Sequence, residues 1–301
     1  MDQRKQLCVV FDIDETLIQF VSNTYKPIWD NLNDEIKSKF STTTDSKGHL
    51  IILRPHIRDL FNYFKSKPEI KVGLWTYSER EYSKHISEIL SNVLELPPDF
   101  FMFTWGAEDM DEELDGYEST GNAKDLTRIY HMFPNFNTFN TFIVDDLYKN
   151  IKHDTNINNS IIIEPFAPLG TSKVRVDIGA EKQTKLSQDL AFVELKQICE
   201  KSLADILGCD LDDIDEAFKT ESLFSAKRVK RMGLDNYRKT YAIQFIHMMT
   251  IGAPMQKNDF ILVNQNYGHH VKGGTKRRRR KNLYVKGKHS RKHSRKHKKN
   301  K

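Results

Sequence analysis

The chain alternates short runs of apolar, often β-branched residues with longer segments in which apolar residues recur at every third or fourth position. A short run of this kind predicts a buried strand, and the longer spacing predicts an amphipathic helix. The strand pattern occurs at residues 7–11, 49–54, 71–76, 100–104, 141–146 and 160–163, and the helix pattern at residues 55–67, 79–93, 124–133 and 181–207. Strands that alternate with helices predict an α/β fold with a doubly wound, mainly parallel sheet.

The segment between the first strand and residues 71–76 is longer than a single crossover helix needs. Part of it is accounted for by the strand at 49–54 and by a helix that begins at Pro55. Residues 18–47, which contain Trp29 and a polar turn, remain. They are expected to form either a surface loop or a β-hairpin inserted after the first strand.

The character of the sequence changes after Gly170. Further helical patterns follow at residues 181–207, 212–224 and 235–249, and the last residues are basic and low in complexity. We therefore predict a first domain at residues 1–170, a helical accessory region at residues 171–262 and a disordered basic tail at residues 263–301.

The formal net charge of +6 conceals a division of the chain. From Lys272 onward there are sixteen Lys and Arg residues and no acidic residue, which leaves 31 basic and 41 acidic residues before it, a net charge of −10. Such a tail repels itself and has nothing to bury, so it is expected to be disordered. Residues 272–301 are expected to contact nucleic acid without sequence specificity, to act as a nuclear import signal, or only to keep the protein soluble.

Several classes of protein are disfavoured by composition. No run of eighteen apolar residues occurs, so a membrane span is not expected. Cys8, Cys199 and Cys209 lack zinc-site spacing and are expected to be reduced. The N-terminus runs directly into the first strand, so no signal peptide is expected. The expected location is intracellular, in the nucleus or cytoplasm, and the composition is similar to that of viral proteins that act in a host cell.

An acidic stretch at residues 108–118 has no apolar periodicity. It partly imitates a calcium-binding loop, but Asn122 stands where such a loop carries a glutamate. It is expected to be an exposed loop.

Polar residues follow several of the predicted strands. Asp12 and Asp14 come directly after residues 7–11, Thr76 ends the second long strand, and Asp145 and Asp146 end residues 141–146. The carboxyl ends of parallel strands meet at one edge of a sheet, where α/β folds place their ligands. Two carboxylates spaced in this way suit two roles: Asp12 can act as a nucleophile that also binds a hard cation, and Asp14 can act as a proton donor. Taken alone, the first motif also fits an Asx-turn followed by a threonine cap.

Four motifs in order resemble those of the haloacid-dehalogenase superfamily. They are Asp12-Ile13-Asp14-Glu15-Thr16-Leu17, then Trp75-Thr76-Tyr77-Ser78, then Lys124-Asp125-Leu126, and finally Val144-Asp145-Asp146. The residues of these motifs are most similar to those of the FCP/SCP-like branch, the phosphatases of the polymerase carboxy-terminal domain (CTD). The resemblance covers roughly residues 5 to 170 and implies a Rossmann-like haloacid-dehalogenase fold. The insertion then corresponds to a small β insertion that helps to select a peptide substrate.

The resemblance implies a role for each motif residue. By this resemblance, Asp12 is the nucleophile and Asp14 is the general acid and base. The phosphoryl group is bound by Thr16, Thr76 and Lys124. Mg²⁺ is held by Asp12, Asp146 and the backbone carbonyl of Asp14. Asp145 is expected either to reach the metal through water or to pair with Lys124. Arg54 is expected either to orient the insertion or to touch the substrate. Leu147 and Tyr148 depart from the small residue and proline that the branch often has, which puts the polymerase tail in doubt as the substrate.

These features predict a Mg²⁺-dependent phosphatase that hydrolyses phosphoserine and phosphothreonine in a phosphoprotein or phosphopeptide through an aspartyl phosphate. A phosphatase of nucleotides or nucleic-acid ends is the alternative enzyme. A non-catalytic nucleic-acid-binding protein on the same scaffold is the alternative from another class.

Overall fold

The computed structural model describes residues 5–111, 123–151, 159–172 and 174–208. The helices expected at 212–224 and 235–249, and the basic tail, lie outside the described residues. No helix in these ranges is both long and apolar enough to cross a membrane.

The core of the molecule is a five-stranded parallel sheet in the order β6-β5-β1-β7-β8. Its strands are β1 (Leu7–Phe11), β5 (Ile70–Trp75), β6 (Phe101–Trp105), β7 (Thr141–Asp145) and β8 (Ser160–Ile162). β1 occupies the centre, where Val9 pairs with Val72 of β5 on one side and with Phe142 of β7 on the other. The predicted α/β fold with a mainly parallel sheet is confirmed.

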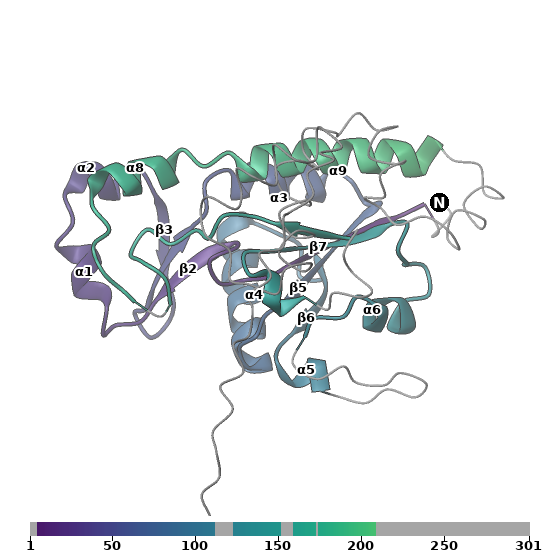
Figure 1. The fold of residues 1–301 in the computed structure, drawn as a ribbon, viewed down its shortest axis with the longest axis horizontal. Coiled ribbons are helices and arrows are strands. Elements are labelled where there is room, and N and C mark those ends of the chain that lie inside the picture. Colours follow the sequence, from purple (N-terminus) through teal and green to yellow (C-terminus); the bar gives the residue numbers. More distant parts are fainter. Residues whose placement is uncertain (1–4, 112–122, 152–158, 173, 209–301) are drawn as a thin grey trace, which may run out of the picture.

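Helices cover both faces of this sheet (Figure 1). Leu7, Val9 and Phe11 of β1 face a core shared with α3 (Ile57–Lys65), α4 (Arg80–Leu94) and α9 (Ala191–Gly208). Cys8 and Val10 face the opposite core, which includes residues of α5 (Glu108–Asp111) and α6 (Thr127–Met132). Alternate residues of a strand point to opposite faces, so burial on both faces explains why β1 is a continuous apolar run.

The inserted segment forms a second, antiparallel sheet in the order β2-β4-β3. Its strands are β2 (Ile18–Val21), β3 (Ser41–Thr44) and β4 (Leu50–Leu53), and α1 (Lys26–Asp30) and α2 (Asp34–Lys37) connect β2 to β3. The predicted small β insertion is confirmed. Trp29, Phe40 and Phe166 form its own apolar cluster with residues of β2 and β4.

Three predicted segments differ from the structure. The single helix expected at 181–207 is divided into α8 (Ala180–Ser187) and α9, because the Asp189 side chain accepts a hydrogen bond from Ala191 N at 2.8 Å and so begins a new helix. The exposed loop expected at 108–118 starts with the short helix α5, in which Met110 is buried. The helix expected at 124–133 begins only at Thr127.

Candidate active site

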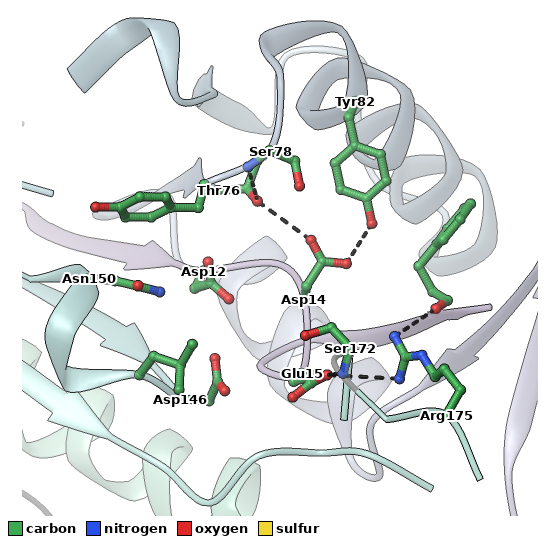
Figure 2. A pocket seen from close by; sticks show the side chains of 13 residues that line it. Asp12, Asp14, Glu15, Thr76, Ser78, Tyr82, Asp146, Asn150, Ser172 and Arg175 are labelled. Carbon is green, nitrogen blue, oxygen red and sulfur yellow. Dashed lines mark hydrogen bonds and ion pairs between the residues drawn. The ribbon is translucent and has the colours of Figure 1, made fainter. Parts of the chain in front are cut away.

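The loop after β1 carries the two aspartates in a tight turn. Leu17 N and Ile18 N both donate to the carbonyl of Ile13, and Glu15 has a left-handed backbone conformation with φ of 61°. The carbonyl of Glu15 accepts Phe166 N at 2.6 Å, which ties the turn to the segment after β8. This fixed turn places the Asp12 and Asp14 side chains in different surroundings (Figure 2).

Asp12 belongs to a buried cluster with Lys124. The Lys124 Nζ lies 2.5 Å from Asp12 Oδ1 and 2.8 Å from Asp145 Oδ2, and its side chain is fully buried. The pair with Lys124 is one of the two roles predicted for Asp145, and the other, contact with the metal through water, stays a prediction. Asp145 also accepts Leu147 N at 2.7 Å, so its carboxylate is held by the backbone as well.

Asp12, Asp145 and Asp146 form the one group of potential metal ligands found among the described residues, with ligating atoms that all lie within 4.8 Å of one another. The Oδ2 atom of Asp146 is buried and has no hydrogen-bond partner. An unpartnered carboxylate oxygen is costly inside a protein. A hard cation such as Mg²⁺ prefers oxygen ligands of this kind, so the residues fit a magnesium ion.

The crowding of these acids shifts their pKa values. Burial, opposed by Lys124, raises the pKa of Asp12 to about 8. Burial and the neighbouring Asp145 and Asp12 raise the pKa of Asp146 to about 9. Lys124 keeps its proton because the attraction of Asp12 and Asp145 outweighs burial and raises its pKa. Without a cation, like charges at this separation oppose full ionisation.

Asp14 lies apart from this cluster. Its Oδ1 accepts a hydrogen bond of 2.6 Å from the Tyr82 hydroxyl of α4, and its Oδ2 lies 3.5 Å from Thr76 Oγ1. Burial raises the pKa of Asp14, although the Tyr82 hydroxyl opposes the shift. A carboxyl group with a raised pKa is suited to hold a proton and release it.

Asp12, Asp14, Thr76 and Asp146 line a cavity of about 350 Å³ at the carboxyl edge of the sheet. The rest of its lining comes from the loop after β1, β2, α4, the loops after β5 and β7, and the segment after β8: Glu15, Phe20, Tyr77, Ser78, Tyr82, Leu147, Asn150, Ser172 and Arg175. Tyr77 and Leu147 are each 40% exposed. The cavity therefore has an acidic floor and a partly apolar rim.

Two predicted residues lie behind the cavity rather than on it. Thr16, predicted to bind phosphate, is fully buried, and its hydroxyl lies 3.5 Å from Asp146 Oδ1, where it can orient that carboxylate. Lys124 does not line the cavity and reaches the site through Asp12.

Arg54 was predicted either to orient the insertion or to touch the substrate, and its contacts support a structural role. It is buried, and it donates to the carbonyls of Thr16 at 3.1 Å and Glu164 at 2.7 Å and to the Asp189 carboxylate at 2.7 Å. The guanidinium therefore joins the aspartate loop to the segment after β8 and to the break between α8 and α9.

The sequence pattern did not indicate Tyr82, Glu15, Ser172 or Arg175. Ser172 N donates to Glu15 Oε1 at 2.5 Å across 157 positions, and Tyr82 reaches Asp14 across 68. The one available signal for Tyr82 was its place on the apolar face of a helix next to Thr76. That position is equally consistent with a core residue.

Comparison with known proteins places the chain in a family. Residues 7–188 match the family model of the NLI interacting factor-like phosphatases. Among solved structures, the fission yeast RNA polymerase II CTD phosphatase Fcp1 in a variant bound to beryllium fluoride is 18% identical, with a TM-score of 0.38 over 77% of this chain and 68% of that chain. A second structure, of Fcp1 described as an essential RNA polymerase II CTD phosphatase, is 16% identical, with a TM-score of 0.38 over 87% and 70% of the two chains.

A comparison with curated proteins yields no match. The family match covers more than half of the chain and includes every motif residue from Asp12 to Asp146. The chain therefore belongs to the NLI interacting factor-like phosphatases, and it is a phosphomonoester hydrolase of the haloacid-dehalogenase type.

Proposed function

We propose that the protein is a Mg²⁺-dependent phosphatase that removes phosphate from phosphoserine and phosphothreonine in other proteins. The observation that carries this proposal is the separation of the two aspartates. Asp12 contacts Lys124 and lies within 4.8 Å of two further acids, whereas Asp14 is held by Tyr82 and Thr76. One carboxylate is thus surrounded as a nucleophile and the other as a proton donor.

The first half of the reaction uses both residues. An Asp12 oxygen attacks the phosphorus atom, the bond from phosphorus to the ester oxygen breaks, and Asp14 gives its proton to that departing oxygen. The product is a phosphoryl group on Asp12. Thr76 lines the cavity beside Asp14, where its hydroxyl can contact a phosphoryl oxygen.

The second half releases phosphate. Asp14, now ionised, takes a proton from water, the water oxygen attacks phosphorus, and the bond from phosphorus to Asp12 breaks. Asp12 and Asp146 would hold Mg²⁺, with Asp14 contributing its backbone carbonyl. When bound, the cation supplies positive charge that offsets the repulsion between Asp12 and a phosphate dianion. Lys124, which lies outside the cavity lining, offsets the negative charge of Asp12 and Asp145.

The partly apolar rim supports a protein substrate. Exposed Tyr77 and Leu147 give the cavity apolar surface that a free phosphate does not need and that a peptide side chain can cover. The small antiparallel sheet contributes Phe20 to the same cavity. The resemblance to the CTD phosphatases agrees with a phosphopeptide as the substrate class.

A substrate series tests the proposal. The chelated full-length protein is given Mg²⁺ and assayed for phosphate release from phosphoserine, phosphothreonine and phosphotyrosine peptides and from nucleoside monophosphates. We expect activity to depend on Mg²⁺ and to be highest on the phosphoserine and phosphothreonine peptides. Full activity after exhaustive chelation would contradict the metal assignment, and faster turnover of nucleotides would contradict the substrate class.

A further inference from the structure

The cavity wall beside Asp14 is formed by the segment that follows β8, called here the strap and comprising residues 164–172 and 174–176. The strap contributes Ser172 and Arg175 to the cavity. In Figure 2, Asp14 lies between Asp12 and Arg175. Because Asp14 gives its proton to the ester oxygen in the proposed reaction, the departing part of the substrate lies on the Arg175 side of the cavity.

The strap is fixed to the insertion by hydrogen bonds. The buried Gln19 of β2 donates to the carbonyl of Gly170 at 2.6 Å and accepts Leu169 N at 2.8 Å. Gly170 has a φ of +71°, and a Cβ there would lie 2.2 Å from the Val174 carbonyl oxygen, so this turn requires glycine. Arg175 therefore extends from a rigid element.

The contacts of the Arg175 guanidinium orient it and include one long ion pair, with Glu15. Its Nη1 donates to the Gly170 carbonyl at 2.7 Å and its Nη2 to the Phe20 carbonyl at 3.1 Å. The ion pair with Glu15 joins Nη1 to Oε1 over 3.8 Å, and the same carboxylate oxygen accepts Ser172 N. Neutral carbonyls leave the positive charge in place, and the planar fork of arginine has further N–H groups to donate.

Arg175 also stands out by its charge. Of the described residues that line the cavity, it is the one cation, and it faces a set of acids made up of Asp12, Asp14, Glu15 and Asp146. The Tyr82 and Phe20 rings, in edge-to-face contact at 5.6 Å, contribute to the same cavity. The departing part of a substrate thus meets an aromatic surface beside one fixed cationic donor of hydrogen bonds.

We propose that Arg175 is a specificity-determining residue that binds a carbonyl or carboxylate oxygen in the departing part of the substrate. This proposal rests on the proposed phosphatase function and narrows its substrate class. Such an oxygen is present within a few bonds of the ester oxygen in every phosphoserine or phosphothreonine residue, as the backbone carbonyl. An acidic neighbouring side chain supplies it as well, whereas a simple alkyl phosphate has none.

The test compares three substrates with the same alkyl leaving chemistry: ethyl phosphate, phosphoserine blocked at both ends, and a phosphoserine peptide with a neighbouring glutamate. The full-length chain, its Arg175→Gln and Arg175→Lys variants, and a matched Arg58→Gln control are assayed on each. Arg58 is exposed on α3 and donates to the Val93 carbonyl away from the cavity. Hydrogen bonds to charged groups contribute about 1.5–3 kcal/mol, or roughly 10- to 150-fold in kcat/KM.

We expect Arg175→Gln to lower kcat/KM at least tenfold more on a phosphoserine substrate than on ethyl phosphate, mainly through KM, while Arg58→Gln changes none of the three. If the greater loss of kcat/KM is seen in full with blocked phosphoserine, the bound oxygen is the backbone carbonyl. If it is seen only with the glutamate peptide, the bound oxygen is that of a carboxylate. Equal losses on all three substrates, or no loss, would overturn the proposal.

Two further readings keep the test decisive. If thermal unfolding shows that Arg175→Gln does not fold, the same comparison is made with Arg175→Lys, because lysine keeps the positive charge and lacks the planar guanidinium. The loss of kcat/KM should then again be greater on the phosphoserine substrates than on ethyl phosphate, by a smaller factor. If the wild-type protein hydrolyses none of the substrates with Mg²⁺ present, the proposed function fails. Wild-type turnover without an Arg175 differential overturns this inference alone.

Discussion

Asp12 and Asp14 differ in the groups that surround them, and this predicts different losses when each is changed to asparagine. Asp12→Asn removes the nucleophile at constant size, so phosphate release from a phosphoserine peptide should fall to background. Asp14→Asn removes proton transfer, which contributes about 10²- to 10⁴-fold, and the loss should be smaller on an aryl phosphate whose oxygen departs without a proton. The measurement is kcat/KM on both substrates, because kcat also includes the second half of the reaction, in which Asp14 takes a proton from water whichever substrate was used.

Asp59→Asn is the matched control for these variants, because Asp59 lies on α3 with a mostly exposed side chain. It should retain wild-type kcat/KM. Substantial activity in Asp12→Asn would remove Asp12 from its role, and equal losses of Asp14→Asn on both substrates would show that Asp14 does not transfer the proton.

The raised pKa values of Asp12 and Asp146 predict that the effect of Mg²⁺ on stability depends on pH. In the metal-free protein their pKa values are about 8 and about 9, against about 4 for an unfolded aspartate. Between pH 4 and 9 the folded state therefore binds more protons than the unfolded state, so the stability that these groups contribute falls as pH rises. A cation binds the ionised carboxylates, and its stabilising effect should grow over the same range.

Thermal unfolding with and without Mg²⁺ at pH 6 and pH 8.5 checks this prediction. We expect the Mg²⁺-dependent rise in Tm to be larger at pH 8.5, and Asp146→Asn to reduce the difference between the two pH values. A rise that is equal at both pH values, or larger at pH 6, would contradict it.

Asp12, Asp14, Thr76 and Asp146 could be placed at one edge of the sheet because each follows a buried strand, whereas Lys124 was indicated by its motif alone. Tyr82 and Arg175 could not, because their contacts join segments far apart in the sequence. Thr16 shows that a match to a motif does not establish where the side chain lies. It matches its motif, yet the turn at Glu15 buries its hydroxyl beside Asp146.

At the scale of elements, α9 packs directly on the central sheet. The Phe192 ring is buried and its centroid lies 6.2 Å from that of the Phe11 ring of β1. The Arg54 guanidinium carbon lies over the Phe192 ring, 5.4 Å from its centroid. Truncating a buried phenylalanine costs about 3–5 kcal/mol. Phe192→Ala should therefore lower the free energy of unfolding by this amount, in one cooperative transition of sheet and helix.

Leu190→Ala is the neighbouring control, since Leu190 is 55% exposed and its truncation should change stability by no more than about 0.5 kcal/mol. Chemical denaturation followed by circular dichroism measures both. A separate early transition in Phe192→Ala would show that α9 is an independent unit rather than part of the sheet's core.

The elements that could be predicted are those whose apolar pattern is local. β3 has the sequence Ser-Thr-Thr-Thr and is mostly exposed, so only its pairing with β4 reveals it as a strand. The division between α8 and α9 depends on Asp189, which pairs with Arg54 across 135 positions. A helical pattern cannot show such an interruption.

At the scale of the whole molecule, the packing of α9 places residues beyond 170 in the same core as β1. The predicted division into parts at residues 170 and 262 stays a prediction, as do the intracellular location and the nucleic-acid contact. The distribution of charge is a property of the sequence alone: about −10 before residue 272 and +16 after it. This separation predicts that catalysis and any binding of polyanions are independent of each other.

Removal of residues 272–301 tests that independence. All motif residues precede the deletion, so hydrolysis of a small aryl phosphate should be nearly unchanged. Binding to duplex DNA should weaken strongly, and the full-length chain should show a steep fall in affinity with salt, at a slope of about −0.9 for each phosphate contacted. Sequence should matter little, because phosphate contacts carry no base information.

The measurement is a salt titration of binding to two unrelated duplexes, with the full-length and the shortened chain side by side. If both bind with the same affinity and slope, the basic residues serve only solubility or targeting. Contact with nucleic acid would then have to come from the remaining residues, whose net charge of −10 repels phosphate. Loss of phosphatase activity in the shortened chain would instead show that the basic residues act on the site itself, and that the two charge blocks of the chain are coupled.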